Sequence, residues 1–182
     1  MPEVITQSVG GKAVTATATF TRPANTTAYT SGDIVSNSAS ATTLMKFARM
    51  ARSCAGSGAL VKARLVTDNT SDTSSYRLYL YTKSEAGLTI PADNAAATTL
   101  YADKDKLVGY IDFAALTKAS GTNTAAHALW TGGIGSTTEP SGELFYVTDA
   151  ADTALYGVLV VLGALTPTSG QNFWVELTAQ QN

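Results

Sequence analysis

The sequence predicts an all-β fold, an antiparallel β-sandwich of jelly-roll-like type with eight or nine short strands and two long loops. Short runs of alternating apolar and polar residues recur along the 182 residues, separated by clusters of Gly, Ser, Asn and Asp. Apart from one ambiguous stretch, no segment has a helical period, and a parallel sheet would need crossover helices. Charged residues make up only 14% of the chain and threonine is abundant, which suits half-exposed pleated surfaces.

The first predicted strand covers residues 13–20. Its apolar residues share one face and its threonines share the other, the apolar set being Val14, Ala16, Ala18 and Phe20. Pro23 ends this run because it cannot donate to a ladder, and it holds Arg22 extended. The Ser-Gly-Asp sequence at 31–33 predicts a turn into a brief second strand at 34–35.

Residues 44–52 are ambiguous, because their apolar positions fit either a helix face or a strand face. The Gly-rich turn at 55–58 and the strand predicted after it, at 60–67, favour a hairpin. In the 60–67 strand the alternation places three apolar residues inward and two cations outward: Val61, Ala63 and Leu65 against Lys62 and Arg64.

The next predicted strand, 76–81, has an apolar face and an aromatic face. The face expected in the core carries Tyr76, Leu78 and Leu80. Tyr79 and Tyr81 share the opposite face with Arg77. Two interpretations of that face stay open, because aromatic rings beside a guanidinium are typical of protein interfaces and tyrosines also pair across neighbouring strands.

Two long loops are predicted, at residues 83–106 and 117–142. Structureless loops of this length are uncommon in compact domains and tend to be functional, so we expect them to contact neighbouring molecules. A strand at 107–113 separates them, with Gly109 allowing a close approach. Its expected inward residues are Leu107, Ile111 and Phe113.

The C-terminal part is strongly β. Residues 144–148 and 156–165 are apolar on both faces, as expected for central strands that are covered on both sides. The 173–178 strand returns to alternation, with Phe173, Val175 and Leu177 inward and Trp174 and Glu176 outward. We expect one sandwich domain, residues 12–182, preceded by a flexible N-terminal arm, residues 1–11.

The charge pattern argues against nucleic-acid and membrane partners. The net charge is −2, and a nucleic-acid binder should carry a basic stripe. The densest basic group is favoured as solvated strand faces over a phosphate-binding patch: Arg49, Arg52, Lys62 and Arg64. No apolar run reaches the roughly 18 residues that span a bilayer, and the first residues lack the features of a signal peptide.

No residue set predicts catalysis, cofactor binding or a metal site. Cys54 and His127 are the only residues of their types; we expect a buried or partly buried thiol and a loop histidine rather than a nucleophile with its base. The paired aspartates, which lack calcium-loop spacing, are interpreted as turn formers: Asp68 with Asp72, Asp103 with Asp105, and Asp149 with Asp152. Nothing singles out Glu139 and Glu143 as a glycosidase pair, and the Gly-rich 132–135 segment lacks a strand-to-helix context. We therefore expect a non-enzymatic protein without cofactors.

A short motif near the N-terminus resembles tailed-bacteriophage virion structural proteins of the capsid decoration or cement type. The motif is Phe-Thr-Arg-Pro at 20–23, Thr-Thr-Ala-Tyr at 26–29 and Gly-Asp-Ile-Val at 32–35. Looser similarity extends to segments 58–67, 76–81, 108–113, 155–157 and 173–177. The two predicted loops match nothing in that family.

The resemblance implies a jelly-roll-like subunit that binds the major capsid protein, sits on the capsid surface of the virion, and is made in the host cytoplasm. It also implies a homo-oligomer, a dimer or trimer. The alternative is a receptor- or carbohydrate-binding domain of a head or tail fibre, with Tyr79, Tyr81, Trp130 and Trp174 as possible platform residues. A glycoside-active jelly roll is a third hypothesis, without a motivated carboxylate pair.

Overall fold

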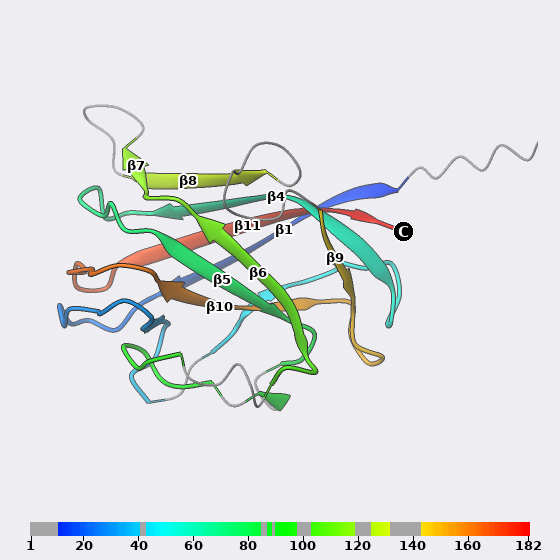
Figure 1. Cartoon of the computed structure of the whole chain (residues 1–182), viewed down its shortest axis with the longest axis horizontal. Coiled ribbons are helices and arrows are strands. Elements are labelled where there is room, and N and C mark those ends of the chain that lie inside the picture. Colours follow the sequence, from blue (N-terminus) through cyan, green and yellow to red (C-terminus); the bar gives the residue numbers. More distant parts are fainter. Residues whose placement is uncertain are drawn as a thin grey trace, which may run out of the picture.

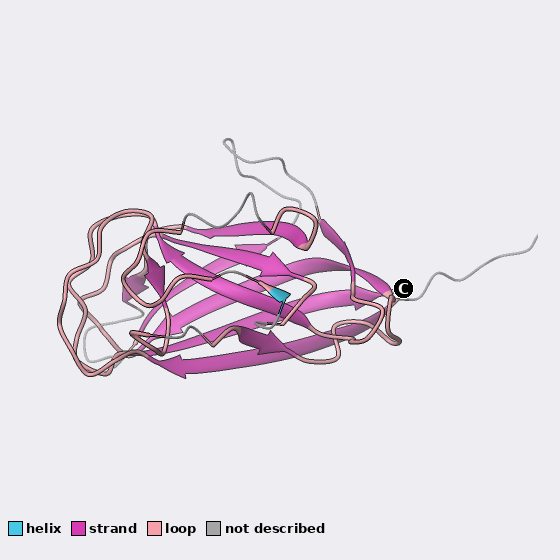
Figure 2. Ribbon diagram, turned by 90° about the horizontal axis from the view of Figure 1, so that it is seen from below, coloured by secondary structure: helices cyan, strands magenta, loops and turns pink. Residues whose placement is uncertain are grey.

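The structure is a computed structural model that describes residues 11–40, 43–84, 87–88, 90–97, 103–118, 125–131 and 143–182. It consists of two antiparallel sheets packed face to face, so the predicted all-β sandwich is confirmed. Figure 2 shows the strands running along the length of the molecule, with loops joining them at the ends. Among the described residues, no helix is long and apolar enough to cross a membrane.

The first sheet has six strands, and Figure 1 shows their order from β8 through β4 and β11 to β1. In spatial order they are β1 (Lys12–Thr21), β11 (Asn172–Gln181), β4 (Ser57–Thr67), β8 (Ala126–Thr131) and β7 (Thr117–Lys118), and β9 (Leu144–Val147) pairs with β4 beside β8. The second sheet has five strands. They are β2 (Ile34–Val35), β10 (Leu155–Val161), β5 (Tyr76–Tyr81) and β6 (Leu107–Phe113), and β3 (Met45–Phe47) also pairs with β10.

The strand order is that of a jelly roll. The first sheet reads β1-β11-β4-β8, and the second reads β2 or β3, then β10-β5-β6. The chain therefore crosses repeatedly between the sheets, as two interlocked Greek keys require. The jelly-roll-like prediction is confirmed, although eleven strands are described instead of eight or nine, because β7 and β8 lie within the predicted 117–142 loop.

The core lies between the sheets and is built by the predicted inward faces. Phe173, Val175 and Leu177 of β11 are fully buried, while Trp174 and Glu176 face outward. The Phe173 ring stacks on Phe20 at 5.2 Å and meets Tyr76 edge-on at 5.7 Å. Each such buried side chain stabilises the fold by roughly 1.5–3 kcal/mol relative to an exposed one.

Two β-bulges reverse the alternation of side chains within a strand, so two residues lie on the face opposite to the predicted one. In β4, the pairing with β11 skips Val61, so Leu60 is fully buried and Val61 only partly. In β6, the pairing with β5 skips Val108, so Leu107 lies on the face opposite Ile111. The inward assignments of Val61 and Leu107 were therefore wrong, because one extra residue in a strand reverses the alternation beyond it.

The ambiguous segment at 44–52 forms a strand and a turn, but not the predicted hairpin. Met45 and Phe47 of β3 point into the core, as the strand interpretation requires. However, β3 pairs with β10 of the second sheet, whereas β4 belongs to the first sheet. The hairpin prediction was wrong because the intervening turn carries the chain across the sandwich.

The described part of the predicted 83–106 loop covers the outer face of the second sheet. Leu88, Ile90 and Ala97 pack onto Tyr156 and its outward-facing neighbours in β10. Strand β10 is consequently buried along its whole length, which confirms the prediction of a central strand covered on both sides. These three residues cover their own sheet while staying partly exposed, so the expected contact of this loop with neighbouring molecules stays a prediction.

The matching prediction for residues 144–148 was wrong. Strand β9 pairs with β4 on one side and presents alternate residues to solvent, so Phe145 is 69% exposed and Val147 is 57% exposed. The structure thus has one covered outer face, on the second sheet, and one open outer face, on the first.

Candidate binding surface

The structure separates the two residues that could have formed a nucleophile and base. Cys54 is exposed in the turn before β4, so the buried or partly buried thiol was a wrong prediction. His127 lies in β8, opposite Val66 near the far end of β4, and is not the predicted loop residue. The nine residue steps from Ser57 to Val66 span about 30 Å of strand. No Cys–His pair can act across that distance.

Three of the six paired aspartates, Asp72, Asp149 and Asp152, accept hydrogen bonds from amides one or two residues on, as turn formers do, whereas Asp68 accepts from Asn172 of β11. Asp149 accepts a hydrogen bond from the Ala151 amide at 3.0 Å, and Asp72 accepts one from the Ser74 amide at 2.9 Å. A hydrogen bond from the Tyr156 hydroxyl, assisted by Lys46, lowers the pKa of Asp152 to about 2. Within the described ranges, no three His, Cys, Asp or Glu side chains gather as a metal site would require.

Two further candidates lie partly or wholly beyond the described ranges. Glu143 is exposed at the start of the segment leading to β9, while Glu139 falls outside the described residues. The Gly-rich 132–135 segment also falls outside them. The interpretation that neither forms a site therefore stays a prediction.

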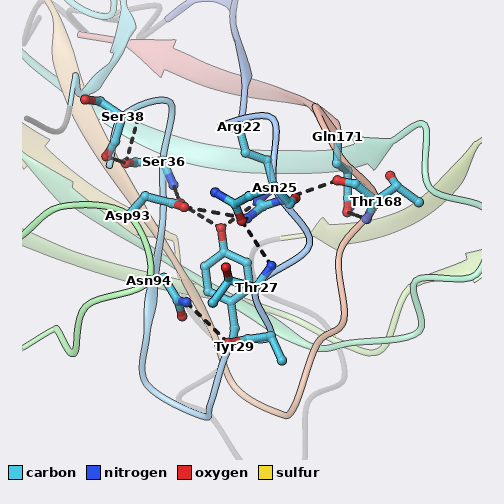
Figure 3. Close-up of polar contacts among 11 residues, drawn as sticks. Arg22, Asn25, Thr27, Tyr29, Ser36, Ser38, Asp93, Asn94, Thr168 and Gln171 are labelled. Carbon is cyan, nitrogen blue, oxygen red and sulfur yellow. Dashed lines mark hydrogen bonds and ion pairs between the residues drawn. The ribbon is translucent and has the colours of Figure 1, made fainter. Parts of the chain in front are cut away.

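A buried polar cluster holds the N-terminal motif in place (Figure 3). The Arg22 side chain is fully buried, and its Nε donates to the Tyr29 hydroxyl at 2.6 Å. That hydroxyl donates to Asp93 Oδ1 at 2.7 Å, while Arg22 Nη2 lies 3.6 Å from Asp93 Oδ2. Burial, with the hydrogen bond to Asp93, raises the pKa of Tyr29 well above its usual value. The hydroxyl therefore stays protonated and can donate.

The cluster joins four segments at one end of the sandwich. Arg22 Nη1 donates to the carbonyls of Asn25 and Thr168, and the Arg22 amide donates to the Gln171 carbonyl at 3.0 Å. Asp93 also accepts from the Ser36 amide at 2.8 Å. Because every one of these groups is satisfied within the fold, the cluster is a structural tie and not a ligand site. The motif at residues 20–35 therefore serves to build this buried cluster.

The open outer face of the first sheet carries threonines and a small charged group. Lys62 and Arg64 each lie 3.8 Å from the carboxylate of Glu176, and the Arg64 guanidinium lies 4.6 Å over the Trp174 ring. These two cations are therefore solvated residues on a strand face, as predicted. Arg49 and Arg52, in contrast, line a separate hollow of about 650 Å³ with Lys12.

An apolar margin lies along the β8–β9 side of this open face. We use the name "apolar margin" for Leu129, Phe145 and Val147, which are 55%, 69% and 57% exposed. All three point away from the core, since their register partners in β4 lie on the outer face. Phe145 and Val147 lie two residues apart on β9, whereas Leu129 lies opposite Arg64, roughly 15 Å further along β4. Neighbouring exposed apolar residues are typical of interaction sites, whereas single scattered ones need no explanation.

Two glycines fix strand β9 beneath the apolar margin. A Cβ on Gly58 would lie 2.4 Å from the Tyr146 hydroxyl oxygen, so a residue larger than glycine at position 58 would clash with the tyrosine side chain. Tyr146 donates its hydroxyl to the buried Met50 carbonyl. At the other end of β9, Leu144 packs against Gly109, whose φ of 154° and close contact confirm the predicted close approach. The backbone that carries Phe145 and Val147 is thus anchored by the inward-facing Leu144 and Tyr146.

The three proposed platform residues whose side chains are described, Tyr79, Tyr81 and Trp174, do not form a platform with one another. Tyr81 is buried under the 83–106 segment, and Tyr79 meets Tyr110 edge-on at 5.9 Å, which favours the cross-strand interpretation. Trp130 lies in β8 and not in a loop; its side chain falls outside the description. Trp174 lines a groove of about 600 Å³ with polar neighbours that include Thr21, Asp68 and Asn172.

Comparison with known proteins gives no family assignment. No family model and no curated protein sequence matches the chain. Among solved structures, a chain of the cyanophage Pam1 capsid asymmetric unit is similar, with 15% identity, a TM-score of 0.34, and coverage of 100% of this chain and 94% of that chain. A marine algae virus of the order Picornavirales gives 14% identity, a TM-score of 0.28, and coverage of 100% and 73%. Both similarities are too weak to carry a functional argument.

Proposed function

We propose that this protein is a non-enzymatic virion structural protein that binds the outer surface of a tailed-phage capsid as a decoration or cement subunit and stabilises the shell. Its partner would be the major capsid protein, and its location the capsid surface. The proposal takes its virion context from the motif at 20–35. Its physical support is a jelly roll with one covered and one open outer face.

The observation that carries the proposal is the apolar margin. Its side chains alternate along their strands with the buried Ala128 and Tyr146, so the backbone that carries them is already ordered and binding would cost little conformational entropy. On the open face beside the apolar margin, Lys62 and Arg64 both lie close to Glu176, and many of the other side chains are threonines. A protein partner can cover such a face without burying a charge that has no counter-ion. A protein surface is therefore a better match for this face than a charged polymer.

The test is cosedimentation with empty shells of the phage that encodes the protein. The wild-type protein should pellet with the shells. A double variant with Phe145→Ser and Val147→Ser should bind about 30-fold more weakly or worse. Burying one such apolar side chain contributes roughly 1.5–3 kcal/mol, and each serine would lose most of that binding free energy. Leu162→Ser is the matched control, because Leu162 is an exposed apolar residue after β10 of the second sheet. Equal binding by the double variant and wild type would contradict the proposal.

The groove beside Trp174 supports a second candidate, a carbohydrate- or receptor-binding domain of a fibre. The groove is lined by Trp174 together with Asp68 and Asn172. Those two side chains already bond each other, with Asn172 Nδ2 donating to Asp68 Oδ2 at 2.6 Å, so a sugar would have to replace that bond. Glycan-array binding that disappears in Trp174→Ala, without binding to shells, would favour this candidate over the capsid-binding one.

A further inference from the structure

We propose that the free edge of strand β1 pairs with β1 of a second copy, antiparallel about a two-fold axis, and so joins two first sheets into one continuous sheet. This inference concerns the protein in solution and does not depend on capsid binding. It gives the predicted homo-oligomer a specific surface, a specific symmetry and a dimeric state. A two-fold contact of this kind uses the same patch on both copies.

The first step is that β1 is bonded on one side only. Its ten residues pair with β11, from Lys12 opposite Gln181 to Thr21 opposite Asn172. It is the last strand in the spatial order of its sheet. Across the described residues, no hydrogen bond other than those of this ladder reaches the main chain of β1. Half of the peptide groups in β1 therefore face outward from the sheet.

The second step is that β1 lacks the short length, the bulge and the proline that often protect a sheet edge. The opposite margin of the first sheet ends in β7, of two residues, and β9, of four. In the second sheet, β2 and β3 are equally short and β6 is interrupted by its bulge. Strand β1, by contrast, is ten residues long, pairs with β11 without a register shift, and contains no proline. Long, regular edges are templates for another strand.

The third step concerns charge. Residues 13–21 contain no charged side chain, so two identical edges meet without like-charge repulsion. The one charged residue of β1, Lys12, lies at its end. The outward side chains are threonines, and Thr15 already bonds the Thr178 hydroxyl at 3.3 Å across the β1–β11 ladder. The same hydroxyl ladder can continue across a two-fold axis.

The register follows from the alternation of side chains. When the axis is perpendicular to the sheet, residues opposite each other must share a face. A register centred on Thr17 satisfies this and pairs residues 13–21, about 30 Å of strand with about eight to ten main-chain hydrogen bonds. It brings together Thr17 with Thr17, Thr15 with Thr19, Ala16 with Ala18, and Val14 with Phe20. A register centred on Ala16 would instead place Lys12 opposite Phe20, so the Thr17 register is the better match.

The pairing leaves the proposed capsid-binding surface free. Strand β1 and the apolar margin lie at opposite sides of the first sheet. A dimer would therefore present two open faces side by side with an apolar margin at each far end. Such a dimer could contact two sites on a shell at once, which raises avidity without a new kind of contact.

The test combines disulfide trapping with a charge block. In a Cys54→Ser background, which removes the exposed native thiol, Thr17→Cys should form a covalent dimer under mild oxidation. Thr15→Cys alone should not, whereas Thr15→Cys combined with Thr19→Cys should, because only the Thr17 register brings those two positions together. A trap at Thr15 alone would overturn the proposed register and with it the proposal.

The charge block uses Thr17→Lys, which places two cations opposite each other at the axis, with Thr17→Ser as its control. Analytical ultracentrifugation should show a wild-type dimer and at least about a tenfold weaker dimer for Thr17→Lys. Melting of the dilute proteins, measured alongside, should be alike, since Thr17 is exposed in the single copy. A wild-type protein that is monomeric at roughly 200 µM, a trimer, or a dimer that Thr17→Lys leaves unchanged would overturn the proposal.

Discussion

Replacing Arg22 by methionine should destabilise the protein strongly, although Arg22 touches no proposed partner. Methionine keeps most of the length of the side chain but removes the cation that faces Asp93. The Asp93 side chain is only 2% exposed, so it would be left as a buried carboxylate without its counter-ion. Breaking one partner of a buried ion pair costs about 3–5 kcal/mol.

The size of the chain converts that cost into a measurable shift. For a domain of this length, each kcal/mol lowers Tm by about 2–4 °C, so Arg22→Met should melt roughly 6–20 °C below wild type. The assay is thermal and urea unfolding followed by circular dichroism. Combining Arg22→Met with Asp93→Leu should cost less than the sum of the two single changes, because the double variant strands no charge.

The matched control is an exposed ion pair on the second sheet. Lys46 lies 3.2 Å from Asp152 with 55% of its side chain exposed, so Lys46→Ala should cost less than about 1 kcal/mol. If Arg22→Met cost as little as Lys46→Ala, the cluster at residues 20–35 would not be the structural tie described above.

Two more predictions concern β9 and the acid limit. Gly58→Ala should destabilise by about 1–3 kcal/mol in urea unfolding, because its Cβ would overlap Tyr146, whereas Gly163→Ala, which meets no described atom within 4 Å, should be near neutral. Native Asp152 has a depressed pKa, so its stabilising effect is present above the unfolded-state pKa of about 4 and is lost as pH falls toward about 2. The advantage of wild type over Asp152→Asn should therefore be seen at pH 6 and vanish near pH 2. An advantage that persisted at pH 2 would mean that the carboxylate is not responsible.

Alternation predicted the inner faces well where one residue type marked each face. Strand β11 is the clearest case, because Phe173, Val175 and Leu177 alternate with polar or amphipathic neighbours. It failed where two apolar residues are adjacent, at Leu60–Val61 and Leu107–Val108, because either member can point inward and a bulge decides. Strand β8 was missed because its inward residues, Ala126 and Ala128, are small and carry little strand signal.

Pairing between distant segments was beyond prediction from one sequence. The turn after β3 looked like a hairpin, but the partner of β3 is β10, far along the chain. Likewise, nothing local to Arg22 indicates that Asp93 will meet it in the buried cluster. The expectation that no catalytic site is present could be argued from composition alone. The apolar margin could be found only from the structure, because the sequence pattern predicted Phe145 and Val147 to be core residues.

Electron cryomicroscopy of the intact virion tests the capsid-binding proposal most directly. We expect a two-sheet jelly roll on the outer surface of the shell, with Leu129, Phe145 and Val147 facing the major capsid protein and the covered second sheet facing solvent. Density for this fold on a tail or head fibre, or a shell contact made through the second sheet, would contradict it.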